Sequence, residues 1–360
     1  MSAPLNSSWW VRKAGTAAGL SLALSVASCG LPRLVGGGDE APALPFAEVL
    51  DDPNAAASTI LVTPTVSIGD HVYPSLLAAV LSAQDGDVLR LDPGLHGGPI
   101  DVRTSLTLEP SASLGAVTIH SRSATCVSVR GDVDVVLRGF TLRADGLHGE
   151  SRKAAVTVDG GSLSLEYCHV GARANCAVQV IGGSLTMEQC SVAVDGWQTA
   201  ILVAEGSEAS ISDCRVENRA QPGTAVEVWG AQAEITGGRL AATAAVVVAG
   251  TGGTMTVDGT HLIDGGAVAL QGGSLSLEDC NIVGSDRAAA RCFGLLTLAR
   301  SHMQDHDLGL IVSGPEARLT VLDCQWTDVH KAVFYEDGAT EDQLFMTDSS
   351  LLPGRFPAGS

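Results

Sequence analysis

The segment His302 to Asp307 reads HMQDHD and concentrates residue types that bind metal ions. His302, Asp305, His306 and Asp307 supply two imidazoles and two carboxylates within six residues, and both groups are common ligands of transition metals. The segment also stands where a strand is expected to end, and polar side chains are frequent in turns without binding anything. The sequence therefore offers a metal site here, with a solvated turn as the alternative.

Carboxylates recur at equivalent places in the chain. Glu166 and Glu188 end the same short sequence pattern, as do Asp258 and Glu278. If these segments stack as neighbouring strands, each pair lies about 5 Å apart, the separation found in retaining glycosidases. The same geometry suits calcium. No aromatic platform or flanking basic residue accompanies the pairs, so we interpret them as solvated strand residues.

Cysteines also recur at one position of this pattern. Thiols in register could bind a metal or exchange electrons, but no CxxC pair and no histidine shares their expected face. We therefore expect a column of small, buried, reduced side chains. The cysteines are Cys168, Cys190, Cys214, Cys280 and Cys324, and other copies of the pattern have Gly238, Thr260 and Ser301 there.

All these positions belong to an internal repeat. GGSLSLEYC begins at Gly160, GGSLTMEQC at Gly182 and GGSLSLEDC at Gly272. Successive copies lie 20 to 24 residues apart, and a short apolar segment such as AVTV (155–158) precedes each copy. Alternation of apolar and polar residues indicates strands. The sequence thus predicts coils of about 22 residues, each with three short strands, stacked into an all-β solenoid.

Stacking would align one outward residue from the third strand of every coil. Every member of this row is polar and none is acidic, although the chain has 40 Asp and Glu against 21 Lys and Arg. Coils about 4.8 Å apart would repeat donors at close to the length of one sugar unit. The row is His169, Ser191, Arg215, Arg239, His261, Asn281, His302 and Gln325.

This row predicts a surface that binds an extended acidic or hydroxyl-rich polymer. Its five basic residues are the ligand-binding candidates, and planar arginine side chains suit forked hydrogen bonds. The alternative is that these residues pair with acids on neighbouring turns, such as Asp195, Glu217 or Asp264. The candidates are His169, Arg215, Arg239, His261 and His302.

The repeat resembles that of right-handed parallel β-helix proteins, the pectin lyase-like group, which includes many bacterial lipoproteins. The likeness covers residues 59–345. It includes an amphipathic helix expected at 73–83, followed by DGDVLRLDPG (85–94) and a segment containing SLTLEP (105–110). The resemblance implies a right-handed parallel β-helix whose N-terminal end is capped by a helix, and such a cap protects open strand edges from association.

Many members of that group cleave or epimerise acidic polysaccharides. Their catalytic motifs are missing: GLHGG at Gly94 and GLHGE at Gly146 lack the glycine before histidine, and no Arg-x-Pro-x-x-Arg segment occurs. General acid–base chemistry needs groups within mutual reach, and the row expected to line the family's catalytic groove does not supply them. That row is Thr157, Gln179, Leu202, Glu227, Val247, Ala269, Arg291, Ile311 and Phe334.

We therefore predict a rigid scaffold or binding surface, with no catalytic residues and no cofactor. The alternative is a polysaccharide-active lyase, hydrolase or epimerase. We also expect a monomer. The net charge of −19 argues against nucleic acid as a partner.

The beginning of the chain is typical of an export signal. Arg12 and Lys13 precede a short apolar run, and Val26-Ala27-Ser28-Cys29 resembles the lipobox of bacterial lipoproteins. The resemblance implies that residues 1–29 are a signal peptide and that Cys29 becomes the lipid-modified first residue. An ordinary secretory signal is the alternative.

Membrane location and domain boundaries follow from this reading. Gly30 is not the aspartate that retains enterobacterial lipoproteins at the inner membrane, so we expect the outer membrane or the cell surface. Residues 30–58 are rich in Gly, Pro and Ala, as a flexible tether would be. The β-helix domain is expected over 59–345, and a tail over 346–360.

Overall fold

The computed structural model describes residues 64–123, 125–146, 154–173, 176–195, 199–347 and 349. Residues 57–360 belong to one compact unit. The signal peptide, Cys29 and the tether expected over 30–58 lie outside the described residues, as does most of the expected tail. Among the described residues, no helix is long and apolar enough to cross a membrane.

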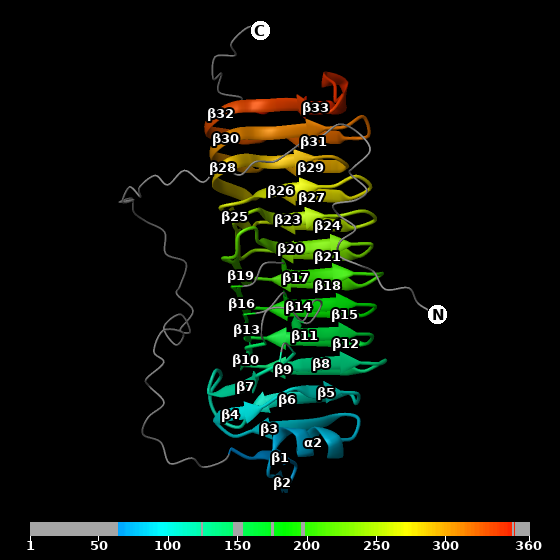
Figure 1. Cartoon of the computed structure of the whole chain (residues 1–360), viewed down its shortest axis with the longest axis vertical. Helices are drawn as coiled ribbons and strands as arrows, with labels where there is room; N and C mark the ends of the chain where they lie inside the picture. Colours follow the sequence, from blue (N-terminus) through cyan, green and yellow to red (C-terminus); the bar gives the residue numbers. More distant parts are fainter. Residues whose placement is uncertain are drawn as a thin grey trace, which may run out of the picture. The chain divides into compact units, whose positions relative to one another are not determined.

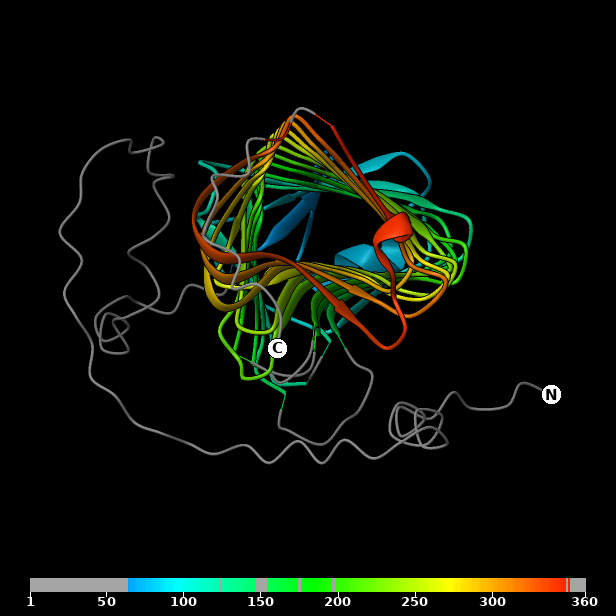
Figure 2. The same ribbon diagram turned by 90° about the horizontal axis from the view of Figure 1, so that it is seen from above.

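Short parallel strands wind into a tall solenoid (Figure 1). Ser162 pairs with Ser184, and Ser184 pairs with Glu208, so one coil takes 22 residues and the next takes 24. Seen end-on, the coils superimpose into a tube (Figure 2). The all-β parallel solenoid with three strands per coil is confirmed. We call its three sides faces 1, 2 and 3, in the order in which a coil visits them from β9 onward.

Face 1 is a 14-stranded sheet that is parallel throughout except for its first two members. Its strands, in sheet order, are β2 (His71–Tyr73), β1 (Val66–Ile68), β3 (Asp87–Leu91), β6 (Leu106–Pro110), β9 (Asp134–Arg138), β12 (Ser162–Glu166), β15 (Ser184–Glu188), β18 (Glu208–Ser212), β21 (Gln232–Thr236), β24 (Thr254–Asp258), β27 (Ser274–Glu278), β29 (Leu295–Ala299), β31 (Arg318–Leu322) and β33 (Leu344–Thr347).

Face 2 follows face 1 in each coil and carries the predicted polar row. Its separate strands are β4 (Gly94–Gly97), β7 (Val117–Ser121), β10 (Phe140–Ala144), β13 (His169–Ala172), β16 (Ser191–Val194), β19 (Arg215–Asn218), β22 (Arg239–Ala242) and β25 (His261–Ile263).

Face 3 completes each coil. Its separate strands are β5 (Ile100–Val102), β8 (Val127–Arg130), β11 (Ala154–Asp159), β14 (Cys176–Ile181), β17 (Thr199–Ala204), β20 (Thr224–Trp229), β23 (Ala245–Ala249) and β26 (Gly266–Ala269). In the last coils three 12-residue strands run through both face 2 and face 3, and these are β28 (Asn281–Cys292), β30 (His302–Ser313) and β32 (Gln325–Glu336).

Within the described ranges, two short helices accompany the strands. Helix α2 (Leu76–Ser82) lies at the N-terminal end of the solenoid and buries Leu76, Ala79 and Val80 (Figure 1). The Ser75 side chain accepts a hydrogen bond from the Ala78 amide, an N-cap that satisfies one of the free donors of the first turn. A 3₁₀ helix, η1 (Glu341–Gln343), precedes β33. A helix was thus correctly expected within 73–83.

The core follows from period-two alternation. In β12, Leu163 and Leu165 are at most 1% exposed, while Ser164 and Glu166 point outward. Because each coil places like residues over like residues, the buried leucines and valines of successive coils form one continuous cluster. A single coil could not bury this apolar surface alone.

The corner between faces 1 and 2 explains the cysteine column. One residue there has left-handed backbone, for example Tyr167 at φ 54° and Asp213 at φ 50°. The next residue points inward against the preceding coil, where space is limited: a Cβ on Gly238 would lie 2.2 Å from the carbonyl oxygen of Cys214. Only small side chains fit such a corner.

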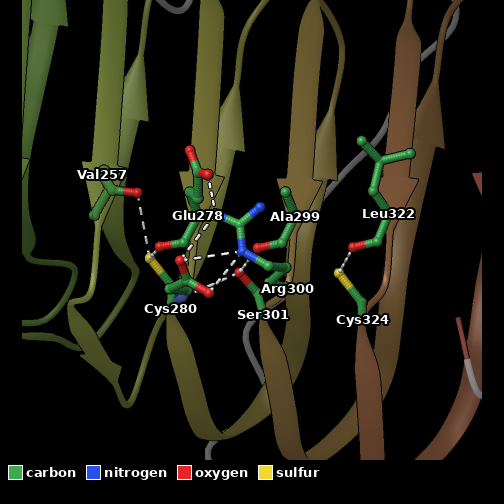
Figure 3. Close-up of polar contacts among 9 residues, drawn as sticks. Val257, Glu278, Cys280, Ala299, Arg300, Ser301, Leu322 and Cys324 are labelled. Atoms are coloured by element: carbon green, nitrogen blue, oxygen red, sulfur yellow. Dashed lines mark hydrogen bonds and ion pairs between the residues drawn. The ribbon is translucent and has the colours of Figure 1, made fainter.

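Thiols and hydroxyls at this corner also satisfy backbone groups. Cys280 donates from Sγ to the Val257 carbonyl, 3.4 Å away, and its amide donates to Oγ of Ser301, 3.1 Å away. Cys280, Ser301 and Cys324 stand side by side in successive coils (Figure 3). Each of the eight cysteines in the described part of the chain is buried and free of disulfides, as the sequence predicted for this column.

One predicted alignment on face 3 is wrong. Val247 and Ala269 were expected to point outward, but both are fully buried, and Val248 and Val268 take the outward places. For Val247 the cause is the comparison of AVVV (245–248) with AVEV (225–228), which is one residue off, because β23 pairs with β20 without a shift and Val248 lies opposite Glu227. For Ala269 the cause is an irregularity between β23 and β26, where the register shifts between Ala245 and Val247. Such an irregularity reverses the facing of every later residue in the strand.

Candidate ligand-binding face

The polar row predicted from the sequence is formed on face 2. Strand pairing aligns its members one to one, and Thr141 of β10 precedes them in the same row. We call this row A, and it runs Thr141, His169, Ser191, Arg215, Arg239, His261, Asn281, His302 and Gln325.

Arg215 is held by an acid of its own strand. Its Nε lies 2.8 Å from Oε1 of Glu217, and a terminal nitrogen of Arg219 lies 3.0 Å from Oε2 of the same carboxylate. Burial alone would raise the pKa of Glu217, but the hydrogen bonds and charges of the two arginines hold it below the usual value. The alternative of local ion pairing therefore describes Arg215.

Arg239 differs from Arg215. Its side chain is exposed, and within the described ranges it forms no ion pair. Its neighbours in row A are Arg215 and His261, so no acid adjoins it along the row. Alanine at position 241 takes the place that Glu217 holds in the coil before. Arg239 is thus the guanidinium of row A that is open to a ligand.

The three histidines of row A have different surroundings. Nδ1 of His169 lies 2.5 Å from Oγ of Ser191, and burial lowers the pKa of this imidazole. His302 bonds through Nε2 to Oγ1 of Thr327 at 2.9 Å. His261 is exposed, with only a long 3.5 Å contact to Asn281. His261 is therefore the most accessible imidazole of the row.

Two further rows on face 2 were not predicted. Row B is two residues along each strand and runs His120, Arg143, Gly171, Ala193, Glu217, Ala241, Ile263, Val283, Gln304 and Thr327. Row C lies just past the strand ends, where backbone hydrogen bonds continue the alignment, and runs Arg122, Asp145, Arg173, Asp195 and Arg219.

Row C alternates in charge from coil to coil, and three of its members are arginines. The charged residues at the start of rows B and C precede Gly160, where the first clear copy of the repeat begins, so the sequence pattern alone did not place them beside the later third strands. The coil before that copy is longer, since Asp134 pairs with Ser162 at a step of 28 residues. Aligning FTLRAD (140–145) with the later third strands would have revealed both rows.

The HMQDHD segment is not assembled as a metal-ligand set. Its expected strand end is wrong, because β30 continues to Ser313. Left-handed backbone at Asp305 (φ 59°) interrupts the alternation and turns His306 into the interior, where Nε2 lies 3.2 Å from the carbonyl oxygen of Ile282, whereas Asp305 and Asp307 are exposed. Throughout the described residues, no group of three or more His, Cys, Asp or Glu side chains is placed to hold a metal ion.

The paired carboxylates of face 1 do have basic neighbours, contrary to our expectation. Arg138, one coil before Glu166, places Nε 2.7 Å from Oε2 of that residue. Arg300, one coil after, bonds to both Glu278 and Asp279 (Figure 3). The sequence alignment overlooked these arginines because each reaches its partner from an adjacent coil. Glu166 and Glu278, one acid of each pair, are thus ion-paired surface residues.

Two depressions among the described residues are lined by faces 1 and 3 and the turns between them. One of about 610 Å³ is lined by Asp85, Arg103 and Arg130 among others. Another of about 360 Å³ has Asp132, Ser162 and glycines of the turn between faces 3 and 1 along its wall. An extended polymer can lie across a flat face without a pocket, whereas a small molecule prefers a concave site.

Comparison with known proteins adds little beyond the fold. No protein-family model and no curated protein matches this chain. The catalytic domain of a GH87 alpha-1,3-glucanase, solved with tetrasaccharides, is 8% identical over 73% of this chain and 64% of that domain, with a TM-score of 0.49. A pectin methylesterase from Yersinia enterocolitica is 11% identical over 80% of this chain and 100% of the other, with a TM-score of 0.34.

The chain therefore spans less than two thirds of the length of the glucanase domain it matches. Both likenesses concern the fold only. Strand order and register establish that fold by themselves: this chain is an all-β parallel solenoid.

Proposed function

We propose that face 2 is a binding surface for an extended polysaccharide, presented rigidly by the solenoid at the cell envelope through a lipid on Cys29. The observation that carries the proposal is the continuous register of row A, which repeats hydrogen-bonding side chains at every coil. Coils about 4.8 Å apart match a polymer whose units have a similar length. Arg239 and His261 are its most open members.

The supporting electrostatics are local. The chain as a whole is strongly acidic at −19, yet row A contains no acid. A positively charged surface on an acidic protein attracts anionic groups and polarised hydroxyl groups. It also repels an anionic ligand less strongly than the acidic faces do. Arginine and histidine side chains then donate to ring and hydroxyl oxygens.

The test uses the soluble chain lacking residues 1–29 and a panel of neutral and uronic-acid polysaccharides in affinity electrophoresis. We expect retention by at least one polymer, and weaker retention for Arg239→Ala combined with His261→Ala. Arg215→Ala should matter less, because Glu217 already engages that guanidinium. A matched control, Arg90→Ala, removes an exposed arginine from face 1.

The proposal is overturned if no polymer is retained, or if the face 1 control weakens retention as much as the face 2 variant. The same incubations distinguish a polysaccharide-active enzyme. New reducing ends, or absorbance from new double bonds, would show catalysis in place of binding alone.

A further inference from the structure

A cluster of four charged side chains lies at the N-terminal part of face 2, outside row A. Nε2 of His120 is 2.8 Å from Oδ2 of Asp145, and Nε of Arg143 is 3.1 Å from Oδ1 of the same carboxylate. Nε of Arg173 lies 3.9 Å from that Oδ1. Two guanidinium groups therefore contact a single carboxylate oxygen. Each residue comes from, or directly follows, a face 2 strand in one of three successive coils.

The cluster has more positive than negative charge. Burial would raise the pKa of Asp145, but hydrogen bonds from His120 and Arg143 hold it below its usual value, so it is ionised at neutral pH. Row C places Arg122 on one side of Asp145, and places Asp195 beyond Arg173. Arg122, Arg143 and Arg173 thus outnumber the two aspartates, even without His120.

The surplus donors are accessible. The Arg143 side chain is 42% exposed and that of Arg173 is 67% exposed. A guanidinium has five N–H donors, and within the described residues the hydrogen bonds of Arg143 engage only Nε. In row B the residues that follow Arg143 are Gly171 and Ala193, whose side chains are small.

We propose that Arg143 and Arg173, held in place by Asp145 and His120, bind a carboxylate group of an acidic polymer that lies along face 2. The planar guanidinium fork matches a carboxylate in a way that a point charge does not. A ligand carboxylate would balance the positive charge of the Arg173 guanidinium, which in this structure shares one carboxylate oxygen of Asp145 with Arg143. The proposal rests on the function proposed above and specifies its ligand as anionic.

The experiment compares polygalacturonate with its fully methyl-esterified form, which has the same backbone without the charge. Binding to the soluble chain is measured by calorimetry at low and physiological salt. We expect the acid form to bind more tightly than the ester, with an affinity that falls as salt rises. Arg143→Gln combined with Arg173→Gln should weaken binding of the acid form by about 10- to 100-fold and leave the ester unaffected.

Arg90→Gln combined with Arg318→Gln is the control, because it removes the same charge from exposed arginines of face 1. If the double variant loses its fold by circular dichroism, Arg173→Gln alone serves, since this side chain is the more exposed.

Equal binding of acid and ester, or equal losses in variant and control, would overturn the carboxylate site while leaving polymer binding intact. Absence of binding to either polymer contradicts the specified ligand. Failure across the wider panel also removes the proposed function. Free galacturonate at matched concentration separates a polymer site from a site for the single anion.

Discussion

The backbone amide of Cys168 donates a hydrogen bond to the Sγ atom of Cys190, 3.3 Å away in the next coil. The amide of Cys190 repeats the contact with Sγ of Cys214, at 3.4 Å. Cys168 and Cys190 also donate to a carbonyl of the coil before, Leu137 at 3.3 Å and Leu165 at 3.2 Å. Cys214 donates within its own coil, to the Ser212 carbonyl at 3.2 Å. The cysteine column therefore adds hydrogen bonds between successive coils at the corner between faces 1 and 2, where the strands of the two faces are interrupted.

These thiols should be inert in the native protein. Cys168 and Cys214 are 2% exposed and Cys190 is fully buried, so a reagent cannot reach these thiols in the folded chain. Burial raises the pKa of Cys168 and raises that of Cys280 to about 11, whereas hydrogen bonds from Cys168 and Cys214 lower the pKa of Cys190. We expect slow labelling by a thiol reagent in native buffer and rapid labelling in denaturant, followed by mass spectrometry. Fast native labelling of Cys168, Cys190 or Cys214, or a mapped disulfide among them, would contradict the structure.

Position 190 should tolerate a small polar residue and reject a large apolar one. Cys190→Leu overfills a closed corner, and we expect a loss of about 1–3 kcal/mol in unfolding free energy. Cys190→Ser preserves a donor and acceptor of similar size, like Ser301 in a later coil, and should be milder. Urea titrations compare the two, and an equal loss would show that space is not limiting there.

Close coil contacts should also make one class of glycine irreplaceable. A Cβ on Gly273 would lie 2.3 Å from the carbonyl oxygen of Ala249, whereas one on Gly97 would meet nothing within 4 Å. Neither position has a positive φ, so backbone strain does not enter the comparison. We expect Gly273→Ala to lower the thermal midpoint clearly and Gly97→Ala to leave it nearly unchanged. The reverse order would refute the assigned coil spacing.

Acid should weaken the domain partly through Glu217. Because its pKa in the folded state lies below the unfolded value of about 4.3, its ion pairs contribute stability at neutral pH. That contribution is lost as the pH falls through the folded pKa. The thermal midpoint of Glu217→Gln should be below that of the parent at pH 7, and the two should converge toward pH 3. A gap that is independent of pH would exclude the linkage.

Lipid attachment is tested on the full chain in a bacterial host. Cys29→Ala should release the protein from the membrane fraction or stall its processing, because the modified cysteine would be the anchor. Unchanged membrane association together with unchanged mass would refute the prediction. Fractionation of the parent between inner and outer membranes tests the expected location.

The fold was predictable because its signal is repeated. Leu163, Leu185 and Leu275 fall on the same inward place in their coils, and each confirms the others. Row A came from the same alignment. The face 3 error at Val247 arose because the run of apolar residues from Ala245 to Ala249 can be aligned with AVEV (225–228) in more than one register. The strand pairing places Val248, and not Val247, opposite Glu227.

The charged contacts were not predictable by the same means. Arg138 and Glu166 are 28 residues apart, and Arg300 reaches back 21 residues to Asp279. Such ion pairs form only when a long side chain reaches across the spacing between two coils. The residue types alone do not reveal which side chains do so. The inward place of His306 has a different cause, since left-handed backbone at Asp305, within β30, interrupts the alternation.

The continuous strands β28, β30 and β32 make the solenoid unequal along its length. In coils from β10 to β26 a turn separates faces 2 and 3, and a turn can gain residues without disturbing the strands it joins. In the last coils the corner between faces 2 and 3 lies inside a continuous strand, and an irregularity there appears as a register shift, as between Ser285 and Ala288 where β28 pairs with β30. Grafted loops or epitopes therefore belong in the earlier coils, beside rows B and C, while the later coils serve as the invariant frame of any engineered derivative.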